Sequence, residues 1–300
     1  MKKFAITGVA GYIAPRHLRA IKDTGNILVA ASDPHDSVGI LDQYFPDAAF
    51  FTEIERFDRH LDKLRRSGKG IDYLSICSPN NLHDAHIRLA LRNDANAICE
   101  KPLVLNPWNL DLLEKLEGEY ERKIFTILQL RVHPSLISLK DKIEKERKTS
   151  KHKVELTYVT SRGKWYDYSW KGDPQKSGGI ATNIGIHFFD LLIWLFGKPI
   201  NYNILMNRTD KMKGELELES ADVSWFLSID KKDLAGDLIR GGKTTYRSIK
   251  IDDKEIEFTE GFTELHTEVY RRTLNGNGFT ISDARPSIEF VQKLRSGIFT

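Results

Sequence analysis

The first 130 residues alternate short apolar runs with segments of helical periodicity, and this alternation limits the possible folds more than any other feature. We expect buried strands at residues 3–7, 27–32, 49–51, 71–77, 95–99 and 123–128. We expect helices at residues 13–24, 54–66, 82–92 and 107–121. Strands alternating with helices of this length indicate a parallel sheet covered on both faces. The sequence therefore predicts an α/β chain whose residues 1–130 form a doubly wound Rossmann domain.

After residue 130 the strand–helix alternation ends, and the expected strands follow one another with few helices between them. A charged helix is expected at 136–148, and Asp252-Asp253 is a candidate hairpin turn. The expected strands are 153–160, 200–206, 215–219, 221–229, 245–251 and 254–258, followed by helices at 264–274 and 283–296. We predict a second α+β domain over residues 131–300, with a mainly antiparallel open sheet that binds substrate and mediates oligomerisation. Its C-terminal helices can pack back on the first domain.

A glycine-containing turn follows the first strand and opens the first helix. Residues 8–14 have the pattern Gly-x-x-Gly-x-x-Ala, a variant of the dinucleotide fingerprint whose small residues let backbone approach a pyrophosphate. Asp33 ends the second strand, 22 residues after Gly11, and no arginine stands beside it. A carboxylate there accepts hydrogen bonds from a ribose diol and repels a 2′-phosphate. We predict NAD as the cofactor; the alternative is an ordinary strand-to-helix connection.

Composition excludes several classes of partner. The net charge of +3 is too small to indicate a nucleic-acid partner. The sequence has no run of about eighteen apolar residues, so no membrane span is predicted. Cys77 and Cys99 lie inside apolar runs, so we expect a reducing, cytoplasmic location without disulfides. The nine histidines are not paired in spacing with cysteines, so no metal site is predicted.

Three further motifs carry a resemblance to a known family. They are Ser-Pro-Asn-Asn-Leu-His at 78–83, Glu-Lys-Pro at 100–102, and the stretch 177–190 with its glycine pair, His187 and Asp190. Together with the first turn they resemble the glucose–fructose oxidoreductase/inositol dehydrogenase/MocA family. The resemblance implies an NAD-dependent oxidoreductase. Two departures are Gly-x-x-Gly in place of Gly-x-Gly, and Asn183 where inositol-type members carry aspartate.

Within that family, residues 11–17, 161–166 and 169–174 are similar to a bacterial lipopolysaccharide branch. Its members oxidise the 3′-hydroxyl of UDP-N-acetyl-2-amino-2-deoxy-D-glucuronate on the route to O-antigen. The resemblance implies this nucleotide sugar as substrate. It also implies a homo-oligomer, a dimer or tetramer packed sheet to sheet.

The resemblance assigns roles to individual residues. Asn183 cannot act as a base at neutral pH, so the acid–base work must fall to Lys101, His187 or water. Lys101 is the first candidate to accept the hydroxyl proton, and His187 is the second, as base, proton relay or hydrogen-bond partner. The expected cofactor residues are Gly8, Gly11, Tyr12, Ile13, Asp33, Ser78, Asn80, Asn81, His83, Glu100, Lys101 and Gln129. The expected substrate residues are Lys101, Arg131, Arg162, Lys164, Trp165, Tyr168, Asn183 and His187. His86 is expected to be solvated.

Other interpretations remain open. The chain could act on another sugar or polyol, such as inositol, a free aldose or a dihydrodiol; an uncharged polyol would not need Arg162 and Lys164. It could also be a non-catalytic NAD-binding regulator, since Rossmann folds serve that use too, or a structural subunit of a polysaccharide assembly complex. Intact Lys101 and His187 argue against the regulator. The sequence does not decide which of the two is the base.

Overall fold

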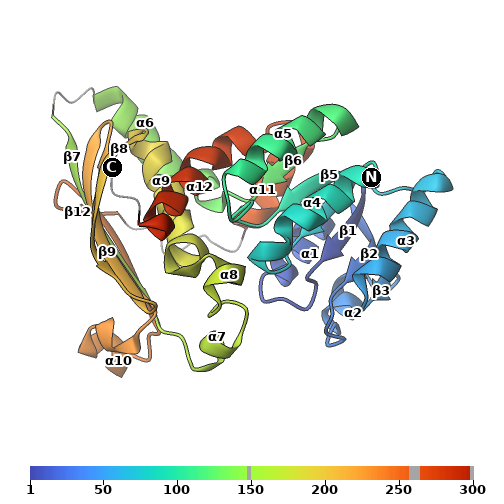
Figure 1. Ribbon diagram of the computed structural model, residues 1–300, viewed down its shortest axis with the longest axis horizontal. Helices are drawn as coiled ribbons and strands as arrows, with labels where there is room; N and C mark the ends of the chain where they lie inside the picture. The colour runs from blue at the N-terminus through green and yellow to red at the C-terminus, as the bar shows by residue number, and fades with distance from the viewer. Residues whose placement is uncertain (147–149, 257–263, 298–300) are drawn as a thin grey trace. The chain divides into compact units, whose positions relative to one another are not determined.

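The computed structural model describes residues 1–146, 150–256 and 264–297 and divides into two compact units (Figure 1). The first is Met1–Gln129 with Thr263–Arg285, and the second is Leu130–Phe262 with Pro286–Thr300. The chain thus returns to the first unit after completing most of the second.

The first unit is built on a six-stranded, wholly parallel sheet of order β3-β2-β1-β4-β5-β6. Its strands are β1 (Lys3–Thr7), β2 (Ile27–Ser32), β3 (Ala49–Phe51), β4 (Tyr73–Ile76), β5 (Asn96–Cys99) and β6 (Ile124–Thr126). The strand order reverses direction between β1 and β4. That point is where open α/β sheets bind ligands, beyond the carboxyl ends of the strands.

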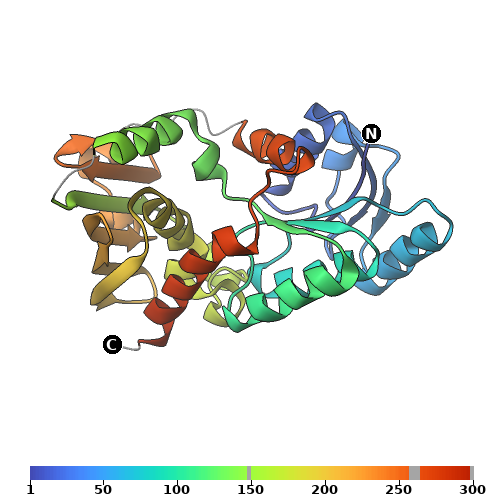
Figure 2. The same cartoon turned by 90° about the horizontal axis from the view of Figure 1, so that it is seen from above.

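Helices cover both faces of this sheet. They are α1 (Ala14–Asp23), α2 (Ile40–Tyr44), α3 (Ile54–Arg66), α4 (His83–Arg92), α5 (Trp108–Tyr120) and α11 (Leu265–Leu274). Helices α1 and α11 pack together on one face, and α4 and α5 lie on the other (Figure 2). Because α11 comes from the far end of the chain, it brings distant side chains against the sheet.

The second unit holds a mixed sheet of order β12-β11-β7-β10-β9-β8. Its strands are β7 (His152–Thr160), β8 (Pro199–Asn207), β9 (Lys211–Leu218), β10 (Ala221–Ser228), β11 (Thr245–Ile251) and β12 (Lys254–Glu255). Only β7 and β10 pair in parallel. Asp252 and Asp253 have φ of 48° and 64°, as a tight hairpin turn requires, so that prediction is confirmed. Residues 257–258 of the last expected strand lie outside the described residues.

Helices of the second unit include several short ones that periodicity did not predict. They are α6 (Pro134–Glu146), α7 (Trp165–Tyr168), α8 (Pro174–Ser177), α9 (Ile186–Phe196), α10 (Gly236–Arg240) and α12 (Ile281–Ser296), which begins in the first unit. Phe189 of α9 packs edge-on against Trp225 and Phe290. A methyl group on Gly185 would lie 2.7 Å from Leu227 and Phe189, so this residue permits close helix-to-sheet packing.

One continuous stretch, Pro174–Phe196, is long and apolar enough on average to cross a membrane. Of its most apolar window, 78% is buried inside the protein. A helix in a protein core meets the same two criteria, and burial of α9 against the sheet accounts for its apolar character. The predicted fold class, a Rossmann domain followed by an α+β domain with a mainly antiparallel sheet, is confirmed.

Candidate active site

The turn after β1 is shaped by a glycine that no other residue could replace without strain. Gly8 has φ of +77°, and a Cβ built on it would lie 2.5 Å from the backbone carbonyl of Cys77. The turn is closed by two hydrogen bonds, from the N–H of Gly11 to the carbonyl of Gly8 and from that of Ala14 to Gly11. The chain then enters α1, whose first N–H groups have no partner within the helix and favour an anion.

Asp33 lies at the end of β2, and its carboxylate is already bonded to backbone. Its Oδ2 accepts from the N–H of Ala10 at 3.0 Å, and its Oδ1 from that of His35 at 2.9 Å. The carboxylate therefore ties the glycine turn to the end of β2. Each oxygen has a second lone pair, so bonding to a ribose diol remains possible.

The Ser78–His86 segment contradicts two expectations. His83 is buried, with Nδ1 2.7 Å from the carbonyl of Pro102 and Nε2 2.9 Å from that of Ser78, so its ring nitrogens pair with backbone and not with a cofactor. His86 is half-buried, not solvated, and its Nδ1 lies 2.8 Å from the Ser78 hydroxyl. Burial lowers the pKa of His86 to about 4. Both histidines brace the loop after β4.

Glu100 and Lys101 follow β5 and form part of a buried polar cluster. Oε2 of Glu100 lies 2.8 Å from Nζ of Lys101. Oε1 of Glu100 lies 2.9 Å from Nε2 of His17 on α1 and 2.9 Å from Nε2 of His266 on α11. The Glu100 side chain is 6% exposed, and both of its oxygens bond to protein groups, so its contact with the cofactor stays a prediction.

The charges in this cluster follow from its burial. Burial alone would raise the pKa of Glu100, but the Lys101 ammonium and the hydrogen bonds from His17 and His266 outweigh it and hold that pKa well below its usual range. Burial lowers the pKa of His266 to about 4, so this imidazole is neutral at pH 7. The cluster therefore holds an ionised carboxylate.

A metal is the alternative occupant of this cluster. One ligand atom each from His17, Glu100 and His266 lies within 4.8 Å of the others. However, both imidazoles are at hydrogen-bond distance from the same carboxylate oxygen. A metal would need the lone pairs of these two nitrogens, which cannot also donate hydrogens. We interpret the group as a hydrogen-bonded cluster.

In the second unit, the glycine-rich motif leads into a π-helical turn before His187. Gly178 and Gly179 have φ of 81° and 72°, and the π-helical residues are Ala181–Gly185. Such turns are frequent at functional sites. Nδ2 of Asn183 donates to the hydroxyl of Tyr166 at 3.0 Å. His187 lies in the first turn of α9.

Arg131 is expected from the sequence to contact an anionic substrate at the edge of the domain junction, and the structure places it in a buried ion pair. Its side chain is 8% exposed. Its Nε and Nη2 donate to the two carboxylate oxygens of Asp190 at 2.9 and 2.7 Å. This bidentate pair fixes α9 from inside, because a buried arginine needs a carboxylate partner.

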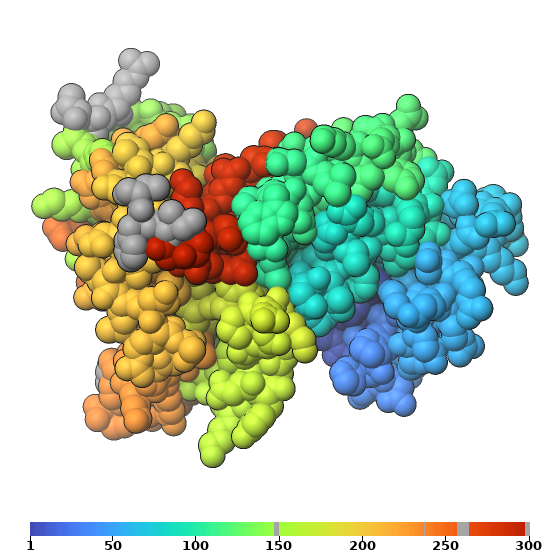
Figure 3. Space-filling view, in the orientation of Figure 1, coloured from blue at the N-terminus to red at the C-terminus, as the bar shows by residue number. Residues whose placement is uncertain are grey.

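The segment that contains α7 lies at the surface (Figure 3). Its exposed side chains include aromatic and basic ones. Trp165 and Tyr168 are 54% and 88% exposed. Lys171, which sequence reasoning did not single out, lies over the rings of Trp165 and Trp170 at 5.6 and 4.8 Å. Burial and the nearby Arg162 lower the pKa of Lys171. Across the described parts of the chain, no carboxylate pairs with the basic groups of Arg162, Lys164 and Lys171.

The remaining expected cofactor residues lie near the ends of the first sheet's strands. Tyr12 is 87% exposed beside the glycine turn, whereas Asn80 and Gln129 are buried. Asn81 is exposed and Ile13 precedes α1. Their roles stay predictions. The residues that sequence reasoning missed are His17, His266 and Tyr270, whose only signal was polar character at positions that α1 and α11 bury.

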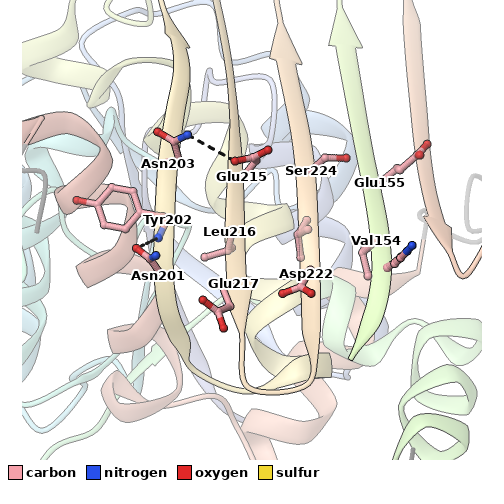
Figure 4. Close-up of a pocket in the computed structure, with 12 residues that line it drawn as sticks. Val154, Glu155, Asn201, Tyr202, Asn203, Glu215, Leu216, Glu217, Asp222 and Ser224 are labelled. Carbon is pink, nitrogen blue, oxygen red and sulfur yellow. Dashed lines mark hydrogen bonds between the residues drawn. The ribbon is translucent and has the colours of Figure 1, made fainter. Parts of the chain in front are cut away.

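A groove of about 500 Å³ lies on the open face of the second sheet (Figure 4). Glu155, Glu215, Glu217 and Asp222 line it, with Lys153 as the one basic residue among its lining residues. A predominantly acidic groove of this kind does not suit an anionic substrate.

The chain matches two family descriptions. Residues 2–127 match the GFO_IDH_MocA oxidoreductase family, NAD-binding Rossmann fold, and residues 150–235 match its C-terminal alpha/beta domain. An uncharacterized oxidoreductase of Escherichia coli K12, YgjR, is 25% identical over 205 residues, which are 66% of this chain and 60% of that protein. Inositol 2-dehydrogenase of Rhizobium meliloti is 26% identical over 202 residues, 65% of this chain and 55% of that protein. The chain thus matches somewhat over half the length of these relatives.

Solved structures include a much nearer relative. The WlbA (WbpB) dehydrogenase of Thermus thermophilus, in complex with NAD and α-ketoglutarate, is 54% identical with a TM-score of 0.96, covering 100% of this chain and 96% of that one. The same enzyme with NAD and UDP-GlcNAcA is 53% identical with a TM-score of 0.95, at the same coverage. WlbA of Bordetella pertussis shares the fold at 20% identity and a TM-score of 0.78, covering 99% and 97%. Family matches, fold and dinucleotide turn together place the chain in the glucose–fructose oxidoreductase/inositol dehydrogenase/MocA family of NAD-binding oxidoreductases.

Proposed function

We propose that this chain oxidises the 3′-hydroxyl of UDP-N-acetyl-2-amino-2-deoxy-D-glucuronate with NAD, giving the 3-keto sugar in lipopolysaccharide O-antigen biosynthesis. The observation that carries the proposal is the full-length similarity, at 53% identity, to a dehydrogenase solved with NAD and UDP-GlcNAcA. The local geometry of each unit supports it separately, at the dinucleotide turn and at the basic segment around α7.

The first unit fits NAD. The backbone of Gly8 approaches Cys77 so closely that no side chain could enter, and the following N–H groups at the start of α1 would hold a pyrophosphate. Asp33 would accept the ribose hydroxyls and disfavour a 2′-phosphate. When bound, NAD supplies the acceptor for the hydride that leaves carbon 3 of the sugar.

Removal of the hydroxyl proton falls to this chain's own residues. Lys101 is the first candidate because it follows β5 at the ligand-binding edge of the sheet, with 15% of its side chain exposed. His187, on the first turn of α9, is the second candidate as base or relay. Either residue would orient the hydroxyl through a hydrogen bond, and it would have to be in its neutral form to accept the proton.

Recognition of the diphosphate and uronate is assigned to the second unit. Arg162, Lys164 and Lys171 are cationic groups without a carboxylate partner among the described residues, so they are available to an anionic substrate. Exposed Trp165 and Tyr168 would stack on the uracil or a sugar face. Asn183 would contact the sugar from the turn before His187.

The decisive experiment measures reduced cofactor by absorbance after mixing purified protein, NAD and UDP-N-acetylglucosaminuronic acid. The comparison arms use UDP-N-acetylglucosamine, which lacks the carboxylate, and myo-inositol. We expect turnover with the uronate only. Absence of turnover with the uronate, together with unchanged NAD affinity in its presence, would reject the substrate. Turnover with myo-inositol alone would favour the polyol alternative.

Bound cofactor must be assayed first, by denaturing the protein and measuring NAD in the supernatant.

The α-ketoglutarate in the Thermus thermophilus complex suggests a second ligand for this chain. We propose that a 2-oxo acid takes up the hydride from the reduced cofactor together with a proton, leaves as the 2-hydroxy acid and so restores NAD. With α-ketoglutarate added to the mixture of protein, NAD and uronate, formation of 2-hydroxyglutarate that requires the uronate would support this; continued accumulation of reduced NAD with no hydroxy acid would refute it.

The open face of the second sheet is the proposed oligomer interface. Along β10 buried residues alternate with exposed ones, so one face of the sheet lacks a covering layer within the described chain. Its mixed acidic and basic side chains allow a self-complementary contact between two copies. We propose a dimer or tetramer in the cytoplasm without nucleic acid or membrane partners. Light scattering of the purified protein tests the assembly, and a monomer at micromolar concentration would reject it.

A further inference from the structure

We infer that His17 and His266 are positioning residues for the oxidation, because together they fix the Glu100 carboxylate that in turn holds Nζ of Lys101. The inference rests on the proposed function, in which Lys101 meets the reacting hydroxyl. It adds two residues, one from α1 and one from α11, that would act on the reaction only through Glu100.

The contacts form an unbroken line from the helices to the lysine. Nε2 of His17 and Nε2 of His266 both lie 2.9 Å from Oε1 of Glu100. The other carboxylate oxygen lies 2.8 Å from Nζ of Lys101 and also accepts from the Lys101 backbone N–H at 3.3 Å. One carboxylate is thus held on one oxygen by two imidazoles and offers the other to the lysine.

The hydrogens can be placed consistently along this line. If Nε2 of His17 donates to Glu100, its Nδ1 must accept, and the hydroxyl of Tyr270 lies 2.7 Å from it as a donor. The Tyr270 oxygen then accepts from the hydroxyl of Ser75 at 2.6 Å. In this arrangement every one of these contacts pairs one donor with one acceptor.

The burial of its members indicates whether the cluster of His17, His266, Glu100 and Tyr270 holds Lys101 in place, as a clamp, or conducts protons. Ser75, His17 and Tyr270 are wholly buried, and His266 is 1% exposed. The line therefore ends at Ser75 in the sheet interior and offers a proton no route to solvent. Lys101, with 15% of its side chain exposed, is the member that can meet a ligand. The cluster is built to hold the lysine in place.

The anchors sit on regular elements, which makes the clamp stiff. His17 projects from α1 and His266 from α11, and the two imidazole rings meet edge-on with their centroids 5.1 Å apart. Ser75 is part of β4. Side chains that orient a reacting group from rigid elements lower the cost of reaching the productive geometry. Loss of the hydrogen-bonded partners that orient metal ligands costs about 10- to 100-fold in activity, and we expect the support of Lys101 to contribute a similar factor.

The test compares His266→Leu with His266→Gln in the full-length protein. Glutamine can place an N–H donor near the position of Nε2, whereas leucine fills the space without a donor. We expect kcat to fall roughly 10- to 100-fold in His266→Leu, with KM for the uronate and the affinity for NAD nearly unchanged. His266→Gln should recover most of the loss. His60→Leu on α3 serves as the matched control, because His60 contacts Phe51 and no member of the cluster.

Two outcomes would overturn the inference: equal activity of the leucine and glutamine variants, or a loss in NAD affinity as large as the loss in kcat. If His266→Leu does not fold, the same comparison is made between His17→Leu, expected to lower kcat without altering NAD affinity, and His17→Gln, expected to recover most of the loss. Glu100→Gln, which removes the charge that holds Lys101, is likewise expected to lower kcat without altering NAD affinity.

A readout without the sugar separates this inference from the proposed function. Competitive acetylation followed by peptide mass spectrometry gives the reactivity of Lys101 relative to exposed Lys69. We expect the relative reactivity of Lys101 to change several-fold in His266→Leu and to return in His266→Gln. That result without any uronate turnover would reject the substrate and keep the clamp. Unchanged reactivity in both variants would reject the clamp even if the uronate is oxidised.

Discussion

Two carboxylates at the carboxyl edge of the same parallel sheet are held in opposite ways. Asp33 accepts hydrogen bonds from the backbone of Ala10 and His35, so its position depends on main-chain geometry. Glu100 accepts from the side chains of His17 and His266, which are 83 and 166 residues away in the chain. The nucleotide end of the site is therefore built from backbone, and the reaction end from particular side chains. Substitutions should affect the two ends differently.

The largest expected effect tests the reaction end. Lys101→Ala should lower kcat about 10²- to 10⁴-fold, the usual range for loss of a proton-transfer group, while the affinity for NAD changes little. Steady-state kinetics and a fluorescence titration with NAD measure the two quantities. Lys69→Ala, at an exposed position, is the control. A near-normal rate in Lys101→Ala would remove Lys101 from the mechanism and leave His187 as the base.

Gly8→Ala tests the nucleotide end, with Gly25→Ala as its match. Both glycines have positive φ, +77° and +74°, but a Cβ on Gly25 meets nothing within 4 Å, whereas one on Gly8 meets Cys77 at 2.5 Å. We expect Gly25→Ala to cost about 1–2 kcal/mol of stability from φ strain alone. Gly8→Ala should cost about 2–5 kcal/mol because overpacking adds to that strain.

Denaturant unfolding measures the stability of both glycine variants, and a titration measures NAD affinity. Affinity should fall only in Gly8→Ala. Equal behaviour of the two variants would show that close backbone approach does not matter at this turn.

Lowering the pH should reduce the free energy of unfolding through His266, which belongs to the proposed reaction end of the site. Above pH 6.5 His266 is neutral in both the folded and the unfolded state. Between pH 6.5 and the folded-state pKa of about 4, only the unfolded state takes up this proton, so stability falls as pH is lowered through that window. The loss of unfolding free energy that comes from His266 is at most about 3 kcal/mol. Urea unfolding at pH 7 and pH 5 measures it, and His266→Gln should reduce the difference. An equal pH dependence in that variant would contradict the assignment.

The smallest expected effect concerns cofactor choice. Asp33→Ala should lower NAD affinity about 10- to 100-fold, the value of losing hydrogen bonds to a charged group. Affinity for NADP should fall less, because repulsion of the 2′-phosphate is removed as well. The measured quantity is the ratio of the two dissociation constants. A ratio equal to that of the unaltered protein would refute the role of Asp33.

Much of the first unit could be predicted because its signals are local. The six strands, the turn at Gly8 and Asp33 at the end of β2 each depend on residues close together in sequence. The protein partners of His83, Glu100 and Arg131 could not be predicted from the sequence. Each side chain is assigned to a ligand because polar residues near a site motif favour that role, and the structure shows that each also satisfies a buried partner: a backbone carbonyl, two imidazoles or Asp190.

The sequence by itself determined the Rossmann architecture, the second sheet and the position of the dinucleotide turn, because strand and helix periods and glycine turns are set by neighbouring residues. Only the tertiary structure decided what surrounds Lys101. His17 lies on the first helix and His266 near the end of the chain, and their meeting at Glu100 depends on the return of α11 to the first sheet. Burial then makes the contact matter, because a carboxylate removed from water must find its hydrogen bonds within the protein.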